Sequence, residues 1–334
     1  MDTIFHPKYL EHRQHGTHPE SPDRLRSILS RLEGEKLIED VLIPESAERE
    51  ILEKTHAPRY LDMLERGSGQ YIDGGDTYLG EETYEIARLA VGGALKGVER
   101  ALDGDRTIAL LRPPGHHAGK DYGGGFCYLN NAAIAADHLN TGRVAIIDLD
   151  AHHGNGTSDI FYSDPNVLYI STHHHGIYPG TGDSMAIGEG PGIGYNVNVP
   201  FKTGCGDSSM DFAWSDVIKP IVTQYEPELI IVSIGTDGHY ADKLTGLTYS
   251  SQCYIRMAER ITALSKELCG GSVSYMLEGG YHLDCLSEIT AGIVASELGK
   301  EITLEYTRVS DTQQKGKEEV LETKDALKKY WELT

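Results

Sequence analysis

Side chains that can do chemistry gather in four short segments of the sequence, and each segment follows an apolar run. The segments are RPPGHHA with His116 and His117, DLDAHHGNGT with Asp148, Asp150, His152 and His153, SIGTDGHYADKL with Asp237, His239 and Asp242, and LEGGYH with Glu278 and Tyr281. Imidazoles and carboxylates bind divalent metals and transfer protons near neutral pH. The four segments therefore predict a metal site with acid–base groups beside it.

The candidate metal ligands are Asp150, His152 and Asp237. Residues i and i+2 at a strand end point to the same side, so Asp150 and His152 can converge and Asp237 can complete the set from another strand. Two carboxylates and one imidazole leave a position open for water and suit Zn²⁺ or Fe²⁺, whereas a structural zinc site would need thiolates. An isolated Asp-x-His pair more often caps a turn, but three further segments of the same kind favour a metal site.

The tandem His116 and His117 follow a Pro-Pro-Gly turn, and two imidazoles on a stiff turn suit proton transfer beside a metal. Asp148 and Asn155 are available as the partners that orient them. Tyr281, on a Gly-Gly turn, can donate a hydrogen bond to a developing oxyanion, although a tyrosine in that position is more often structural.

A glycine run precedes Phe126 at positions 123–125. It offers either a close backbone approach to a ligand beside an aromatic wall or only a flexible loop.

Short apolar runs that alternate with helical patterns must position these segments. Strands are predicted at 107–111, 143–150, 166–172, 195–200, 227–235 and 272–280. Helices are predicted from about residue 23 and at 81–102, 130–140, 208–224, 251–268 and 284–298. The rest of residues 1–60 predicts loops and short helices. This rhythm predicts a mostly parallel sheet with helices on both faces and a site at the carboxyl ends of the strands. We expect one large α/β domain over residues 1–300 and a polar extension over 301–334, with a helix from about 318 to 331 that packs on the domain or frays.

The composition excludes several classes of function. The 334 residues carry a net charge of −21, and because the last 34 hold eight acidic and six basic residues, the other 300 carry −19. Such an acidic body disfavours binding to nucleic acid or to an anionic membrane and favours cationic ligands, although acidity also serves solubility. No apolar run suits a membrane span or a signal peptide. Five cysteines without a C-x-x-C pair predict neither a disulfide framework nor a thiolate zinc site, and hence a cytoplasmic location.

Seven stretches together resemble the histone deacetylase superfamily, which includes acetylpolyamine amidohydrolases. They are RPPGHHA, GGFCYLNNAAIAA, IIDLDAHHGNGT, YISTHHHGIYPGTGD, GYNVNVP, the aspartate of SIGTDGHYADKL, and MLEGGY. They occur in the family's order from about residue 5 to 299, roughly nine-tenths of the chain. The resemblance implies a zinc-dependent deacetylase with an arginase-like fold.

The resemblance also implies roles for single residues. Asp150, His152 and Asp237 match the metal ligands, His117 the base that activates water, and His116 its electrostatic support. The remaining matches cover the partners of the histidines, the residue that polarises the carbonyl, the substrate tunnel and an inner channel. Asp148 matches the hydrogen-bond partner of His116, and Asn155 matches that of His117, as in class II-like members. Tyr281 matches the residue that polarises the carbonyl, and Arg24 matches the residue of the inner channel. The substrate-tunnel residues match Phe126, Tyr178 and the Gly125 carbonyl.

Two monovalent-cation sites for K⁺ or Na⁺ are implied in the same way. The first matches the Asp148 side chain, Ser171 and the backbone oxygens of Asp150, His152 and Thr172, and the second the backbone oxygens of Phe161, Asp164, Val167 and Tyr195.

The substrate is either the acetylated lysine of a protein or peptide or an acetylated polyamine. Polyamine-specific relatives often carry an inserted loop or a glutamate at the position of Leu244, and here the loop from Arg66 to Asp76 is short, so that acetyl-lysine is favoured. The stretch GGFCYLNNAAIAA nevertheless resembles polyamine-type enzymes as well. Two other classes stay open, namely an acyl-lysine-binding pseudoenzyme and an arginase-like ureohydrolase with two manganese ions. The oligomeric state stays open too.

Overall fold

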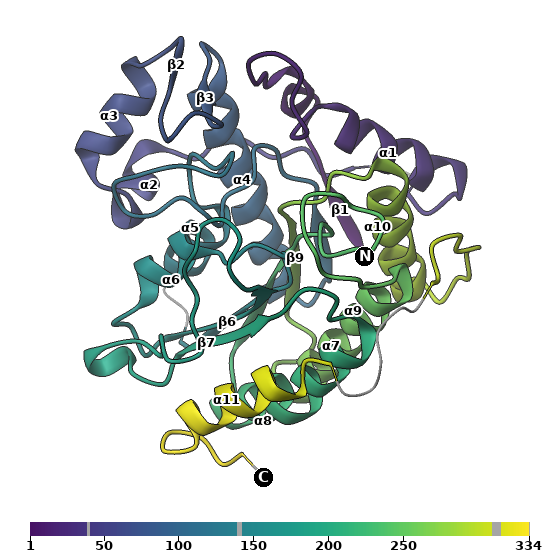
Figure 1. Cartoon of the computed structure of the whole chain (residues 1–334). Helices are drawn as coiled ribbons and strands as arrows, with labels where there is room; N and C mark the ends of the chain where they lie inside the picture. Colours follow the sequence, from purple (N-terminus) through teal and green to yellow (C-terminus); the bar gives the residue numbers. More distant parts are fainter. Residues whose placement is uncertain (39–40, 139–141, 309–314, 334) are drawn as a thin grey trace.

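A seven-stranded sheet in which every neighbouring pair is parallel lies at the centre of the computed structural model (Figure 1). The structure describes residues 1–38, 41–138, 142–308 and 315–333. In spatial order the strands are β1 (Asp2–Ile4), β4 (Thr107–Ala109), β9 (Val273–Leu277), β8 (Leu229–Ile234), β5 (Val144–Asp148), β6 (Val167–His174) and β7 (Asn196–Phe201). The predicted α/β class with a parallel central sheet is confirmed.

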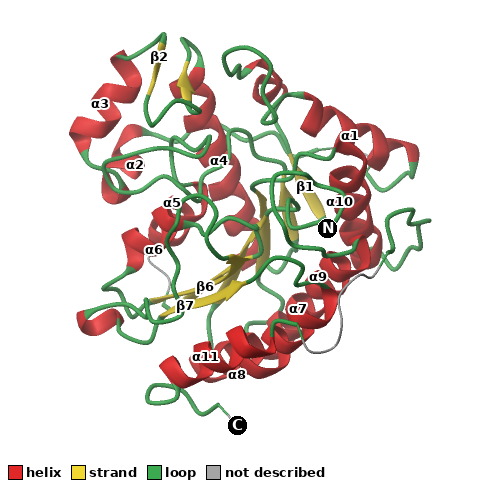
Figure 2. Cartoon of the chain, in the orientation of Figure 1, coloured by secondary structure: helices red, strands yellow, loops and turns green. Residues whose placement is uncertain are grey.

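Helices surround this sheet (Figure 2). They are α1 (Asp23–Gly34), α2 (Arg49–Thr55), α3 (Pro58–Arg66), α4 (Thr83–Leu102), α5 (Asn131–His138), α6 (Asn155–Phe161), α7 (Asp207–Ala213), α8 (Lys219–Tyr225), α9 (Ser251–Leu268), α10 (Leu283–Glu297) and α11 (Lys317–Leu327), with a π-helical turn at Trp214–Ile218 that joins α7 to α8. The predicted helix over 208–224 is thus one helical stretch with a π turn inside it. Residues 139 and 140 of the predicted helix over 130–140 lie outside the described residues.

Adjacent residues of β9 show why both faces of the sheet are covered. Ser274 faces α4, where a Cβ on Gly97 would come within 2.7 Å of the serine hydroxyl. Tyr275 points the other way, and its hydroxyl contacts Thr262 and the Ala258 carbonyl of α9. Because successive side chains of a strand alternate between faces, α4 and α9 lie on opposite sides of the sheet.

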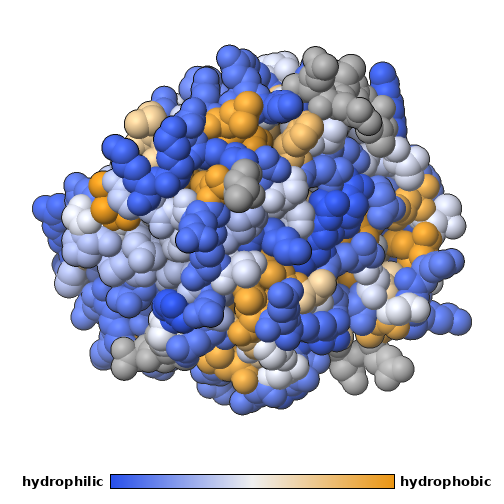
Figure 3. All heavy atoms as spheres, turned by 90° about the horizontal axis from the view of Figure 1, so that it is seen from below, coloured by the Kyte–Doolittle hydropathy of each residue, from blue (hydrophilic) through white to orange (hydrophobic). Residues whose placement is uncertain are grey.

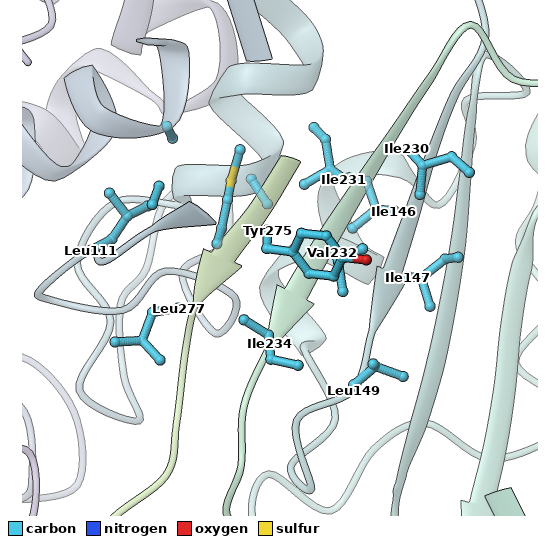
Figure 4. Close-up of a cluster of buried hydrophobic side chains, with 14 of the residues drawn as sticks. Leu111, Ile146, Ile147, Leu149, Ile230, Ile231, Val232, Ile234, Tyr275 and Leu277 are labelled. Carbon is cyan, nitrogen blue, oxygen red and sulfur yellow. The ribbon is translucent and has the colours of Figure 1, made fainter. Parts of the chain in front are cut away.

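The central strands supply a large part of the buried core, mostly with aliphatic side chains. Figure 4 shows the labelled residues of β5, β8 and β9 together with Leu111 and Leu149, and all of them are buried. Strands buried on both faces have continuous apolar sequences such as LIIVSI in β8. This explains why apolar runs located these strands in the sequence.

Two parts of the fold differ from the expectation. β1 adds an edge strand next to β4, where loops and short helices were predicted. β2 (Gln70–Tyr71) and β3 (Tyr78–Leu79) form an antiparallel hairpin that was not predicted. Strands of two or three residues are too short to show a period, so only their pairing partners define them.

The C-terminal helix α11 packs along β7, the strand at the other edge of the sheet (Figure 1). Thr323 donates a hydrogen bond to the Asn198 carbonyl at 2.7 Å, and the Trp331 indole donates to the Gly194 carbonyl at 2.7 Å. Residues 309–314 and 334 of the predicted extension lie outside the described residues.

The surface is polar over most of the face shown in Figure 3, with several separate hydrophobic patches. Among the described residues, no helix has the length and apolar character needed to cross a membrane. The five cysteines all lie among the described residues, and none of them forms a disulfide bond.

Candidate active site

The predicted metal ligands Asp150, His152 and Asp237 come together beyond the carboxyl ends of β5 and β8, and one ligand atom of each lies within 4.8 Å of the others. His152 Nδ1 lies 3.2 Å from Asp150 Oδ1 and 2.8 Å from Asp237 Oδ2. β5 already ends at Asp148, so strand alternation does not bring Asp150 and His152 together as expected. Instead the loop turns back, and the His152 amide donates to Asp150 Oδ1 at 2.8 Å.

This trio fits a divalent metal. Ligand atoms of a tetrahedral zinc site lie about 3.4 Å apart, which is close to the distances seen here. There is little space around these ligands, because a Cβ on Gly279 would come within 2.5 Å of Asp150 Oδ2. Burial lowers the pKa of His152, but the Asp237 and Asp150 carboxylates outweigh burial and hold the pKa well above its usual value. The two carboxylates thus favour a positive charge between them, which a bound cation would supply in place of the proton.

His116 pairs with a carboxylate. Its Nδ1 lies 3.0 Å from Asp148 Oδ2, which also accepts a hydrogen bond from the Tyr169 hydroxyl at 2.9 Å. Burial lowers the pKa of His116, but Asp148 and Asp150 outweigh burial and raise the pKa to about 10. His116 is therefore a cation at neutral pH.

His117 pairs with an amide. Its Nδ1 lies 2.8 Å from Asn155 Oδ1 at the start of α6. Burial and the nearby positive charges of His116 and His152 hold the pKa of His117 well below its usual value. His117 is therefore neutral, as a general base must be before it accepts a proton.

Both histidines face one cavity of about 150 Å³. The residues that line it are Asp76, Pro114, His116, His117, Gly125, Phe126, Asp150, His152, Tyr178, Leu244, Gly279 and Tyr281. Tyr178 and Leu244 are 46% and 45% exposed, whereas Asp150 is buried. The cavity therefore leads from an open rim to the metal ligands at its floor.

The glycine run forms one wall of the cavity. Gly125 has φ +52°, and a Cβ there would come within 2.4 Å of the His117 ring. Phe126 also has a left-handed backbone, with φ +70°, and its amide donates to the Thr77 hydroxyl at 2.9 Å. Gly125 therefore approaches His117 as only a glycine can, and its close approach to a ligand stays a prediction.

Tyr281 also lines the cavity and packs edge-to-face against Phe126, with the ring centroids 5.9 Å apart. Its amide donates to Asp242 Oδ2 at 2.7 Å, and the Arg24 guanidinium stacks over the ring at 5.1 Å. Burial holds the pKa of the Tyr281 hydroxyl well above its usual value, so the hydroxyl stays a proton donor. Arg24 also donates to the carbonyls of Glu278 and Gly280 and thereby braces the Gly-Gly turn.

Two contributors to the site, Asp76 and Tyr122, were missed in the sequence, and a third, Glu278, was noted there without a role. Asp76 lines the cavity from the loop of the β2–β3 hairpin. Glu278 Oε2 accepts the amides of Gly115 and His116 at 2.7 and 3.2 Å and so holds the histidine loop. Tyr122 contacts Asn155. Acidic and aromatic residues occur throughout the sequence, and no motif distinguished Asp76 or Tyr122.

Two of the histidines noted after strands lie elsewhere. His153 contacts the Thr181 hydroxyl at 2.8 Å, and His239 accepts the Ala241 amide at 3.1 Å. Both are buried, and neither is among the described residues that line the cavity.

The residues matched to cation sites fall into two groups along β6. Ser171 pairs in register with Asp148, and the neighbouring Thr172 has a buried hydroxyl. The second group includes Val167, where β6 begins. In this group the Phe161 carbonyl accepts a hydrogen bond from the Asp164 amide at 3.0 Å, and the Tyr195 carbonyl accepts one from the Tyr169 amide at 2.9 Å. Both groups stay predictions.

Comparisons with known proteins show which family the chain belongs to. The model of the histone deacetylase domain family matches residues 18–296. The chain is 38% identical to a probable deacetylase of Archaeoglobus fulgidus, over 90% of this chain and 87% of the relative. It is 35% identical to the chloroplastic histone deacetylase 14 of Arabidopsis thaliana, over 85% of this chain and 74% of the relative. The crystal structure of the HDA15 HD domain superposes with a TM-score of 0.89 at 32% identity, and the match covers 99% of this chain and 97% of that one. The chain therefore belongs to the histone deacetylase family.

Proposed function

We propose that the protein is a metal-dependent hydrolase that removes the acetyl group from the side chain of acetyl-lysine in proteins or peptides. The observation that carries this proposal is the meeting of three features in one cavity. Asp150 and His152 of the metal trio line its floor, a neutral histidine lies beside a cationic one, and a protonated tyrosine lines the same cavity.

Asp150, His152 and Asp237 would hold the metal, with zinc favoured and iron(II) possible from the ligand types. When bound, such an ion lowers the pKa of water and polarises an amide carbonyl.

The side chains divide the remaining work. His117 Nε2 takes the proton from the attacking water, since Nδ1 is engaged by Asn155. The Tyr281 hydroxyl donates a hydrogen bond to the oxyanion of the tetrahedral intermediate. As the C–N bond breaks, the proton held on His117 passes to the lysine nitrogen, and the products are acetate and the free amine. The cationic His116 stabilises the negative charge that develops nearby.

The shape and charge of the cavity support a long cationic substrate. Phe126 and Tyr178 offer aromatic surface to a methylene chain, and the Gly125 carbonyl can accept the amide N–H of the substrate. Leu244 places an apolar side chain at the rim, where a glutamate would attract a second ammonium group, and this favours acetyl-lysine over an acetylated polyamine. The acidic body would also attract cationic peptides.

We also assign structural K⁺ or Na⁺ to the two groups of residues along β6. The Asp148 carboxylate in the first group lies behind His116, so a cation there would lower the pKa of His116 by repulsion.

Parallel turnover assays test the function. Zinc-loaded protein and a chelator-treated sample are given acetyl-lysine peptides, acetylputrescine and acetylspermidine. We expect kcat/KM to be largest for the peptides and lost after chelation, with restoration by zinc. Preference for the acetylated polyamines would reverse the substrate assignment.

Binding and metal content separate the other classes. An acyl-lysine-binding pseudoenzyme would bind the peptides without releasing acetate. A ureohydrolase would hold two metal ions per chain instead of one and would act on none of the three substrates.

A further inference from the structure

A chain of hydrogen bonds leads from His117 away from the cavity. His117 Nδ1 lies 2.8 Å from Asn155 Oδ1, and Asn155 Nδ2 donates to the Tyr122 hydroxyl oxygen at 3.0 Å. The Tyr122 hydroxyl in turn donates to Asp159 Oδ2. Asn155 and Asp159 are four residues apart on α6, so both side chains lie on the same side of the helix.

The donors and acceptors of this chain allow one arrangement of protons. An ionised carboxylate only accepts, so the Tyr122 proton points to Asp159 and the Tyr122 oxygen must accept from Asn155. The NH₂ group of Asn155 therefore faces Tyr122, and its carbonyl oxygen faces His117. Because that oxygen only accepts, Nδ1 of neutral His117 carries the proton and Nε2 keeps its lone pair.

The opposite amide orientation would disable the base. A flipped Asn155 would present its NH₂ group to Nδ1 of His117, and the imidazole proton would then have to sit on Nε2. The flip has nearly the same shape, so packing alone discriminates weakly between the two orientations. The hydrogen bond to Tyr122 is what distinguishes them.

The position of the Tyr122 ring is built into the loop that carries the histidines. A Cβ on Gly119 would come within 2.3 Å of Tyr122 Cε1, so the ring packs on a site that only glycine leaves free. The Gly119 amide donates to the Tyr122 carbonyl at 3.0 Å. Neither Tyr122 nor Asp159 is among the described residues that line the cavity, so direct contact with substrate does not explain their arrangement.

We propose that Tyr122 and Asp159 are positioning residues, which hold the Asn155 amide so that His117 keeps its proton on Nδ1 and offers Nε2 as the base. The catalytic consequence rests on the proposed function, whereas the position of the proton does not.

The first test is Tyr122→Phe, which removes the hydroxyl and keeps the ring on Gly119. We expect kcat on an acetyl-lysine peptide to fall about 3- to 10-fold, the range for one lost neutral hydrogen bond, with KM within about twofold. Tyr330→Phe is the matched control, because this tyrosine is 40% exposed near the C-terminus and far from the site in sequence and contacts. An unchanged kcat for Tyr122→Phe would overturn the proposal.

A test in the Asn155→Asp variant shows whether Tyr122 acts by orienting the side chain at position 155 or only by packing. A carboxylate accepts through either oxygen, so it has no orientation that Tyr122 must hold. Adding Tyr122→Phe to Asn155→Asp should therefore change kcat less than about twofold. A loss as large as in the wild-type background would show that Tyr122 acts by packing, which contradicts the proposal.

Nitrogen-15 NMR of the zinc-loaded, histidine-labelled protein reads the proton position directly, with His117→Gln to assign the signal. We expect the Nδ1–H form in the wild type and a mixture of both forms in Tyr122→Phe. Asp159→Asn should give the same mixture, because its amide can donate to Tyr122 and free the tyrosine proton, and its exposed position makes folding insensitive to the change. An Nε2–H wild type would refute the proposal even in an active enzyme. The Nδ1–H form without turnover would support the positioning and refute the proposed function.

Discussion

His116 and His117 are neighbours in the chain, both are buried, and their ring centroids lie 4.0 Å apart. The structure nevertheless gives them opposite properties. His116 contacts the Asp148 carboxylate and has a pKa raised to about 10, whereas His117 contacts a neutral amide and has a pKa well below its usual value. Burial acts in the same direction on both, so the nearby charges make the difference, with carboxylates beside His116 and the positive His116 and His152 beside His117.

Because of this difference, His117 can transfer a proton and His116 can give electrostatic support. A histidine that is already protonated at neutral pH cannot accept a proton, and a neutral one supplies no fixed positive charge. A metal bound at the trio would add positive charge and lower both pKa values, but Asp148 would still favour the cationic form of His116 over that of His117.

The largest expected effect comes from His117→Ala. We expect kcat on an acetyl-lysine peptide to fall by at least about 10²- to 10⁴-fold, the usual contribution of a general base, with the metal content intact by atomic absorption. His116→Ala should lower kcat less. Retained activity in His117→Ala together with an inactive His116→Ala would reverse the two assignments.

Tyr281→Phe should have the next largest effect. Loss of one oxyanion donor lowers kcat by about 10- to 1000-fold. Because the Tyr281 hydroxyl stays protonated at all working pH values, the pH at which kcat/KM is half-maximal should not move. If that pH did shift with the variant, Tyr281 rather than a histidine would titrate in the working range.

The smallest effect concerns stability and tests the His116–Asp148 pair directly. A pKa raised from 6.5 to about 10 stabilises the folded protein below pH 6.5, and this contribution is lost as the pH rises through 10. We expect the free energy of unfolding of metal-free protein, from urea titrations at pH 7 and pH 10, to fall with pH. In Asp148→Asn the fall should be about 2–4 kcal/mol smaller, since each pKa unit corresponds to about 1.4 kcal/mol. Equal falls in both proteins would mean that Asp148 does not hold the His116 proton.

The parallel sheet was predictable because its buried strands are continuous apolar runs, as in VAIID of β5 and LIIVSI of β8. The candidate site was predictable for a related reason. The carboxyl ends of parallel strands meet at one edge of a sheet, so chemically active residues that follow separate strands, such as Asp150 and Asp237, must approach each other. β1 and the β2–β3 hairpin were not predictable, because segments of two or three residues have no measurable period and form only by pairing.

The types and order of the residues by themselves predicted the fold class, the candidate metal ligands, the histidine pair and the family. These depend on local patterns and on the topology that such patterns impose. The tertiary structure alone decided which histidine is charged, how the loop after β5 turns Asp150 and His152 together, and that Asp76 lines the cavity while Tyr122 contacts Asn155. A pKa, a hydrogen-bond direction and a cavity wall depend on distances between atoms far apart in the chain, and those distances exist only after folding.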